Sequence, residues 1–388
     1  MVGAMRYKSL DVLRGIAILG TLGTNIWLFT SPEGFIGYLE QVDQPSGAWL
    51  WAEKVLQALA QGKFLGLLTI MFGIGLAIQQ RSAVKRGLPW PGPYPWRALL
   101  LFVDGVVHFV LVVEFDVLMG YAVTGLVVAY LLVTSERAQR RWMIATASVH
   151  VALLSLITVA ILAAPAAEPG TAAQFNPYAD GSWWDLVVFR LENALVFRLE
   201  PILIFAMSIA LFLAGAKLFQ AGVLGPQGAA IRRRLLIVGA VAFPIDFTLN
   251  VFGGAAGVVA GRYGTAPFVS LGILGAVATF YAHRDQLGLV GARLSDVGRM
   301  ALSCYVLQNI LASVLCYGWG LGLAAQVGAQ ARVPFTVAVY LVVTAGILLF
   351  ARLWLSRFER GPVEWLWNSS YRAITTRRDQ VPALTGKG

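Results

Sequence analysis

The sequence predicts an all-α fold, a polytopic bundle of about ten transmembrane helices formed by the whole chain, 1–388, as one integral membrane domain. Composition is the first observation behind this prediction. The chain is 58% hydrophobic and 13% charged, with a mean hydropathy of +0.70, and a soluble domain could not bury so much apolar surface. The second is that basic residues alternate with the apolar runs, so the net charge of +10 reflects membrane topology and predicts no nucleic-acid partner.

Ten apolar runs are long enough to cross a bilayer. They lie at 10–29, 58–79, 97–114, 117–134, 142–164, 201–219, 234–254, 265–281, 299–318 and 334–355. The first run has a basic start but no small-residue cleavage site, so we expect a retained helix and not a signal peptide. The basic loops all fall on one side when ten helices are drawn. The positive-inside rule then predicts cytoplasmic N and C termini in a multi-pass protein of a bacterial plasma (inner) membrane.

The third and fourth runs meet without glycine or proline. The segment Glu114-Phe115-Asp116 must supply the turn between them. One uninterrupted helix over this region would be about 55 Å long, far more than the ~30 Å hydrocarbon core. It would also put the basic residues at its two ends in opposite compartments. Two crossings are therefore expected.

Two segments lie outside the predicted bundle. Residues 165–200 form an extracytoplasmic loop with an amphipathic segment, anchored at the interface by Trp183 and Trp184. In the alternative interpretation this segment is a lid, and Arg190 or Arg198 meets a substrate carboxylate or phosphate. Residues 356–388 form a basic cytoplasmic tail.

Acidic residues and a histidine at membrane depth are the main candidates for catalysis. Asp104 and His108 are spaced i, i+4 and share a helix face. Asp116 follows two turns later. A carboxylate bound to one imidazole nitrogen fixes the tautomer and raises the basicity of the other nitrogen, which suits a general base. The alternative is a structural hydrogen bond between packed helices.

Arg14 lies at the cytoplasmic end of the first helix, three residues after Asp11. The two form an ion pair that holds the bundle together, or Arg14 holds an anionic ligand that enters from the cytoplasm. Asn25 lies roughly 16 Å further along the same helix, toward the outer side. Its amide either bridges helices or orients a ligand.

A second polar pair, Asp246 and Asn250, is spaced i, i+4 on the seventh helix. It is expected to face the same cavity as a substrate-binding pair. Arg262, in the outer loop that follows, is expected to pair with Asp246 or Asp116. No metal site is predicted, because the two cysteines lie about 18 Å apart along one helix and neither a CxxC nor a Cys/His cluster occurs.

Four blocks of the chain carry a resemblance to a known family. They are SLDVLRGIAI at 9–18, the segment from KF to MFGIG at 63–75, DGVVH with FDVL and YA at 104–122, and GRMALSCY with the closing GPVEWLW at 298–367. They resemble the YeiB-like membrane proteins with their C-terminal domain of unknown function. Those are grouped with transmembrane acyltransferases such as heparan-alpha-glucosaminide N-acetyltransferase and the acyltransferase-3 proteins.

The resemblance implies transfer of an acyl group from cytoplasmic acyl-CoA, with acetyl-CoA as the first candidate, to a hydroxyl or amine. The acceptor would be a small molecule, a glycan or a lipid-linked group. In this interpretation Arg14 and Arg299 hold the donor, and His108, oriented by Asp104 or Asp116, is the base. Asn25 stands where acyltransferase-3 proteins carry a histidine, so His108 would have to replace that group.

Two other functions remain open from the sequence. A transporter or flippase for a small polar or anionic solute would use Asp104, Asp116, Asp246 and Arg262 along a polar path. A non-catalytic scaffold would use the same pairs only for packing. Membrane lipids are expected partners in every case, and the sequence leaves open whether the chain forms a homodimer.

Overall fold

The computed structural model describes residues 8–39, 44–164, 175–284 and 286–379, and within these ranges it contains helices and no strand. The elements of the first half are α1 (Lys8–Thr30), α2 (Gly34–Leu39), α3 (Ala48–Ala60), α4 (Lys63–Lys85), α5 (Tyr94–Leu111), α6 (Leu118–Leu131) and α7 (Glu136–Ala163). The middle of the chain forms α8 (Trp183–Glu192), α9 (Ala194–Phe197), α10 (Leu199–Leu203), α11 (Phe205–Gln220), η1 (Pro226–Gly228) and α12 (Ala229–Phe252). The remainder forms α13 (Gly254–Ala260), η2 (Gly261–Thr265), α14 (Ala266–Tyr281), α15 (Gly288–Arg299), α16 (Ala301–Cys316), η3 (Leu323–Gln326), α17 (Ala329–Leu355) and α18 (Pro362–Asp379).

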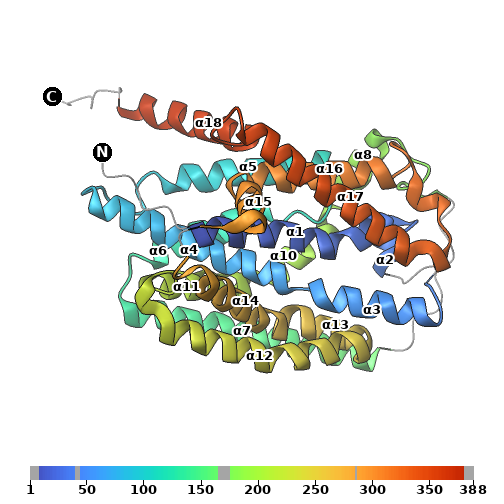
Figure 1. Ribbon diagram of the computed structural model, residues 1–388, viewed down its shortest axis with the longest axis horizontal. Coiled ribbons are helices and arrows are strands. Elements are labelled where there is room, and N and C mark those ends of the chain that lie inside the picture. The colour runs from blue at the N-terminus through green and yellow to red at the C-terminus, as the bar shows by residue number, and fades with distance from the viewer. Residues whose placement is uncertain (1–7, 40–43, 165–174, 285, 380–388) are drawn as a thin grey trace, which may run out of the picture.

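The predicted all-α polytopic bundle is confirmed. Each of the ten predicted ranges contains a helix. Among the described residues, seven helices are long and apolar enough to cross a membrane, and the number reaches nine if each of two bent pairs is one span. The remaining predicted range, 117–134, corresponds to α6, a shorter apolar helix that extends about 21 Å. Figure 1 shows the helices aligned along the long axis, with the start of α1 and the end of α18 toward the same end.

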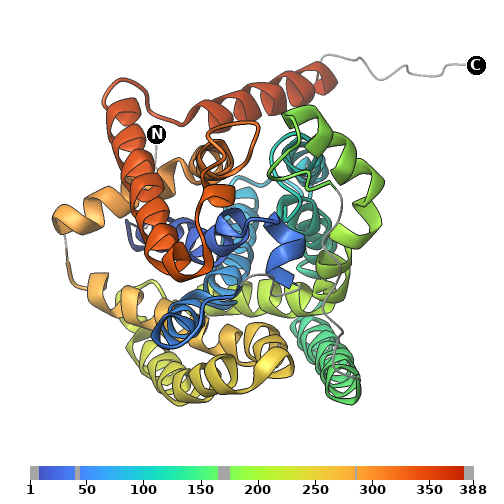
Figure 2. The ribbon, with the colours of Figure 1, turned by 90° about the vertical axis from the view of Figure 1, so that its right-hand side faces the viewer.

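The first helix lies near the middle of the bundle (Figure 2), where it packs against α4, α14, α15, α16 and α17. In its most apolar stretch 61% of the residues are buried, against 11% in α7. Residues on α1 therefore contact the interior along its whole length, whereas α7 mainly offers an apolar surface to lipid. We therefore expect α1 to contribute many of the side chains that line internal cavities.

Glycines allow α1 to lie directly against α15. A Cβ built on Gly298 would overlap the carbonyl oxygen of Asp11, and one on Gly15 would overlap the carbonyl oxygen of Leu294. Two helix backbones can approach this closely only where no side chain separates them. This contact fixes the end of α1 that carries Arg14.

The turn between α5 and α6 occurs where the sequence predicts it. Helix α5 ends at Leu111 and α6 begins at Leu118. The connection is buried, and both Glu114 and Asp116 are 1% exposed. A turn with two buried carboxylates needs partners for them, and arginines of the outer segment supply these.

The predicted amphipathic segment within 165–200 begins, in the described residues, with a short loop and α8; residues 165–174 lie outside them. Its Arg190 is fully buried, pairs with Glu114 at 3.3 Å and donates to the carbonyl of Val110. Tyr178 also donates to Glu114, at 2.9 Å, and burial raises the pKa of Tyr178 well above its usual value. The segment is thus attached to the α5–α6 turn.

The predicted basic tail, 356–388, contains α18 in its described part, and this helix packs against α5 and α16 (Figure 1). Its Glu364 accepts hydrogen bonds from the backbone N–H groups of Leu302 (2.8 Å) and Ser303 (3.1 Å) and from the Ser303 hydroxyl. These amides begin α16, which meets α15 at an angle of 89°. A carboxylate at a helix start satisfies otherwise unpaired N–H groups, so Glu364 stabilises the break between α15 and α16.

Candidate functional site

His108 lies in the last turn of α5, is 2% exposed, and has a hydrogen-bond partner on each ring nitrogen. Its Nδ1 lies 3.0 Å from Oδ1 of Asp116, and its Nε2 lies 3.1 Å from Nδ2 of Asn309 on α16. An amide nitrogen only donates, so Nε2 accepts and Nδ1 carries the proton that is donated to Asp116. The contacts therefore select the neutral Nδ1–H tautomer.

The negative charge of Asp116 is stabilised from three sides. Besides His108, its Oδ2 accepts the N–H of Met119 at 3.1 Å. Arg198 donates to the carbonyl oxygen of Asp116 at 3.1 Å, and its Nη1 lies 4.0 Å from Oδ2. A carboxylate held in this way can stabilise a positive charge that develops on His108.

Asp104, the second carboxylate predicted beside His108, makes no hydrogen bond to the ring. Its Oδ2 is buried without a partner among the described residues. The turn after α5 brings Asp116 back onto Nδ1, which leaves no site there for Asp104. Asp104 and His108 both lie on α5, but the partner of the imidazole ring is set by the turn that follows this helix.

A first cavity, the inner cavity, has a volume of about 370 Å³. Arg14 and Arg299, the predicted donor-binding residues, both line it, and Arg97 lines it as well. The rest of its wall is largely apolar, from Ile18, Leu68, Met71, Phe72, Leu101 and Leu302. Arg14 lies 3.6 Å from Asp11, as the sequence predicts. A basic entrance and an apolar interior suit an amphipathic anion.

A second cavity, the outer cavity, has a volume of about 490 Å³. It follows the other half of α1, from Thr21 to Ser31, and Asn25 is among its lining residues. Arg262 also lines it, together with the amides of Gln57 and Gln61. The predicted substrate residues Asn25 and Arg262 therefore lie in one cavity.

The two cavities share Val117 and Tyr305 in their walls. The ring of Tyr305 is tilted against that of His108, with a centroid distance of 4.9 Å. His108 itself lines neither cavity. Tyr305 thus separates the histidine from the place where the inner and outer cavities come closest.

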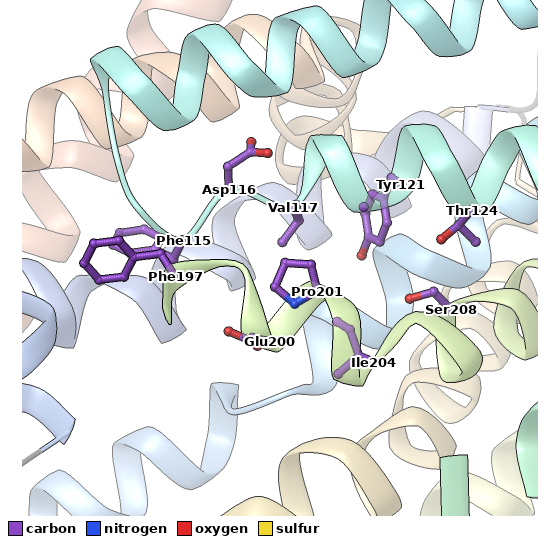
Figure 3. A pocket seen from close by; sticks show the side chains of 11 residues that line it. Phe115, Asp116, Val117, Tyr121, Thr124, Phe197, Glu200, Pro201, Ile204 and Ser208 are labelled. Atoms are coloured by element: carbon purple, nitrogen blue, oxygen red, sulfur yellow. The ribbon is translucent and has the colours of Figure 1, made fainter. Parts of the chain in front are cut away.

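A small recess of about 30 Å³, room for about one water molecule, lies between Asp116 and Glu200 (Figure 3). It shares Val117 and Glu200 with the outer cavity. In the figure the Asp116 carboxylate points toward α5, where His108 lies, and Glu200 is across the recess on α10. Asp116 lines this recess and His108 lines none of the three spaces, so Asp116 is the member of the buried pair that borders an internal space.

The prediction that Arg262 pairs with Asp246 or Asp116 is wrong. Its guanidinium pairs with Glu200 at 2.8 Å, and the hydroxyl of Tyr263 donates to the same oxygen at 2.7 Å. Both residues lie in η2, a π-helical turn, a feature that is frequent at functional sites. The extra residue in this turn directs both side chains to α10, away from Asp246 and Asp116.

Asp246 does not line any of these three spaces, contrary to the expectation that it faces the cavity of Asn25. It forms an ion pair with Lys63 in which both side chains are almost fully buried. Thr265 donates to its other oxygen at 2.9 Å, and Lys63 also donates to the carbonyl of Ala58 at 2.6 Å. All these partners lie within the bundle, which is typical of a structural pair.

Breaking this pair should destabilise the protein, whereas removing it entirely should not. Lys63→Met is expected to cost about 3–5 kcal/mol, because it leaves Asp246 buried and uncompensated, and the double variant Lys63→Met/Asp246→Leu should recover most of that loss. Thermal unfolding of the purified protein checks this. Lys54→Met is the control, since Lys54 lies over the Trp51 ring at the wall of the outer cavity, and it should change stability by less than about 0.5 kcal/mol.

Sequence reasoning missed several residues of the site. Tyr305 and Asn309 occur within an apolar run, where an aromatic and an amide are ordinary core residues. A signal existed in their spacing, because positions 301–313 place Tyr305, Asn309 and Ala312 on one buried face of α16. Glu200 was also missed, because it lies in the short helix α10, just before the bend between α10 and α11, and not in a regular apolar helix.

Comparison with known proteins shows what the chain is similar to. A family model described as a protein of unknown function (DUF418) matches residues 202–373. The uncharacterized protein YxaH of Bacillus subtilis (strain 168) is 27% identical, with 94% of this chain and 94% of the relative covered. The uncharacterized protein YeiB of Escherichia coli (strain K12) is 28% identical, with 96% of this chain and 97% of the relative covered. The family match contains Tyr305, Asn309 and Glu364.

Proposed function

We propose that the chain is a member of the YeiB-like family of membrane proteins, which it resembles, and that it is a transmembrane acyltransferase of the bacterial plasma (inner) membrane. It moves an acyl group from cytoplasmic acyl-CoA, acetyl-CoA in the first instance, to a hydroxyl or amine of a glycan or lipid-linked acceptor. One observation carries the proposal. The inner and outer cavities meet at Val117 and Tyr305, directly beside the buried His108–Asp116 pair.

The inner cavity suits the donor. Arg14, Arg97 and Arg299 offer three permanent positive charges to an anionic ligand. Leu68, Met71 and other apolar residues line the interior, where an acyl thioester can leave water. The volume of about 370 Å³ accommodates the acyl end and its linker and leaves the nucleotide end at the basic entrance.

The outer cavity suits a polar acceptor. Its wall combines the amides of Asn25, Gln57 and Gln61 with the Arg262–Glu200 pair. Amides both donate and accept hydrogen bonds, which matches hydroxyl groups. An acceptor that fills this cavity reaches Tyr305 from the side opposite to the donor.

The chemistry assigned to this chain is proton transfer and charge stabilisation. For this, Nε2 of His108 must lose its hydrogen bond from the Asn309 amide and accept one from the acceptor hydroxyl. The Tyr305 ring, which packs against His108, must move so that the acceptor can reach the imidazole. His108 then takes the proton as the acceptor oxygen attacks the thioester carbon, and Asp116 stabilises the resulting imidazolium. As the carbon–sulfur bond breaks, His108 returns this proton to the thiolate. The donor supplies the activated acyl carbon.

The test is a transfer assay on the full chain in lipid nanodiscs. Radiolabelled acetyl-CoA is incubated with glycan and lipid acceptors, and CoA binding is measured in parallel by calorimetry. We expect saturable CoA binding and label on at least one class of acceptor. Absence of CoA binding would overturn the proposal.

A transporter or flippase is the second candidate, because two cavities that share a wall are also the arrangement of an alternating-access pathway. Asp116 and Arg262 lie along this path, but Asp104 and Asp246 line none of the three spaces. This candidate predicts solute flux into proteoliposomes without CoA, and loss of the flux in Asp116→Asn. A scaffold predicts neither flux nor transfer.

A further inference from the structure

The C-terminal helix α18 presents two different faces. Glu364, Trp367 and Asn368 line the inner cavity. Trp365 and Leu366 are 64% and 59% exposed and line no cavity. The helix is therefore a wall of the inner cavity on one side and an outward-facing surface on the other.

An arginine and two aromatic rings meet at this wall. Trp367 and Tyr371 are stacked, with an interplanar angle of 13° and centroids 5.9 Å apart. The guanidinium carbon of Arg97 lies 5.5 Å from the Trp367 ring centroid and 4.5 Å from that of Tyr371. Gln79 accepts a hydrogen bond from Arg97 at 2.7 Å, which holds it against the rings. The edge of the cavity thus combines a flat aromatic surface with a positive charge.

The charge at this edge favours an anion. Arg14 and Arg299 line the same cavity as Arg97. Among its described lining residues the acidic one is Glu364, and both of its oxygens accept hydrogen bonds from the start of α16. Three guanidinium groups therefore line the cavity together with one carboxylate that already has partners, and one of the three, Arg14, also lies 3.6 Å from Asp11. Guanidinium groups are the side chains best suited to phosphate.

We propose that α18 and Arg97 form a nucleotide-binding site, in which a purine base stacks on Trp367 and the phosphates contact Arg97, Arg14 and Arg299. Aromatic stacking and arginine–phosphate contacts together are the chemistry of nucleotide recognition. The inference rests on the proposed function in one respect, because it takes the nucleotide to be the adenosine end of acyl-CoA. A free nucleotide has the same chemistry, and the binding assay separates the two.

The test compares two tryptophans that are two residues apart. Binding of CoA, ADP and pantetheine to the full chain in nanodiscs is measured by calorimetry for the unchanged protein, Trp367→Ala and Trp365→Ala. A stacked base contributes roughly tenfold to a hundredfold in affinity, so Trp367→Ala should weaken CoA and ADP binding by about that factor. Trp365→Ala should leave both unchanged. Trp367→Phe should restore most of the affinity, which a loss of folding would not allow.

Comparison of the three ligands shows whether the site binds the nucleotide end of CoA or a free nucleotide. CoA that binds more tightly than ADP, with weak pantetheine binding, identifies the nucleotide end of the donor as the group recognised. ADP that binds as tightly as CoA identifies a site for free nucleotides, and both results support the inference. Equal effects of the two alanine variants, or no ADP binding, would overturn it. If Trp367→Ala binds CoA with unchanged affinity and transfers the acyl group at an unchanged rate, the inference is overturned but the proposed function is not. If the protein binds nucleotides but transfers no acyl group, the proposed function is overturned but the inference is not.

Discussion

Replacing His108 by alanine is expected to lower acyl transfer by roughly 10²–10⁴-fold, the usual contribution of a general base. The imidazole is 2% exposed, and its neutral tautomer is selected by Asp116 and Asn309. Alanine removes the proton acceptor and leaves the Asp116 carboxylate without one of its hydrogen-bond donors. Initial rates of label transfer, measured at saturating acetyl-CoA, check this expectation.

The control for His108→Ala is His283→Ala, because His283 is exposed and lies outside the cavities. It should retain full activity. Asp116→Asn keeps the shape of the side chain but removes its charge, so it should lower the rate by roughly 10²-fold with unchanged CoA binding. Asp104→Asn should have a rate within roughly threefold of the unchanged protein, because Asp104 does not contact His108. Full activity in His108→Ala would exclude the proposed base.

The fold was largely accessible from the sequence because lipid-facing helices leave long apolar runs. Each of the ten predicted ranges contains a helix, and the turn at Glu114-Phe115-Asp116 is where the charge pattern requires it. The pattern of apolar runs does not predict a helix that lies outside the lipid. Helix α18 is polar on average. Its position depends on contacts with distant parts of the chain, such as Glu364 with the start of α16 and Trp367 with Arg97 of α5.

The site was accessible only in part, because sequence spacing reports neighbours along one helix and the site joins several. His108 was found from its rarity at membrane depth. Its second partner, Asn309, is 201 residues away and resembles a core amide. The pairing of Arg262 with Glu200 depends on a π-helical turn that apolar periodicity does not reveal. The shared wall at Tyr305 could be recognised only once the two cavities were located.

The same structure connects stability to the donor cavity, because the close contact between α1 and α15 also positions residues of its wall. Arg14 follows Asp11 by one turn on α1, and Arg299 follows Gly298 on α15. Both arginines and Gly298 line the inner cavity. Any change that separates the two helices should therefore reduce both stability and donor affinity.

Gly298→Ala is expected to destabilise the protein by about 3 kcal/mol or more, at the upper end of the range for overpacking. The new methyl group would overlap the carbonyl oxygen of Asp11, and a backbone atom cannot rotate away as a side chain can. The helices must move apart, so CoA affinity should fall together with the thermal unfolding midpoint. Gly75→Ala on α4 is the control for the unfolding midpoint alone, because Gly75 lines the inner cavity; nothing lies within 4 Å of its built Cβ, and alanine in mid-helix is favoured by about 0.5–1 kcal/mol. Equal midpoints for the two variants would show that α1 and α15 are not packed backbone to backbone.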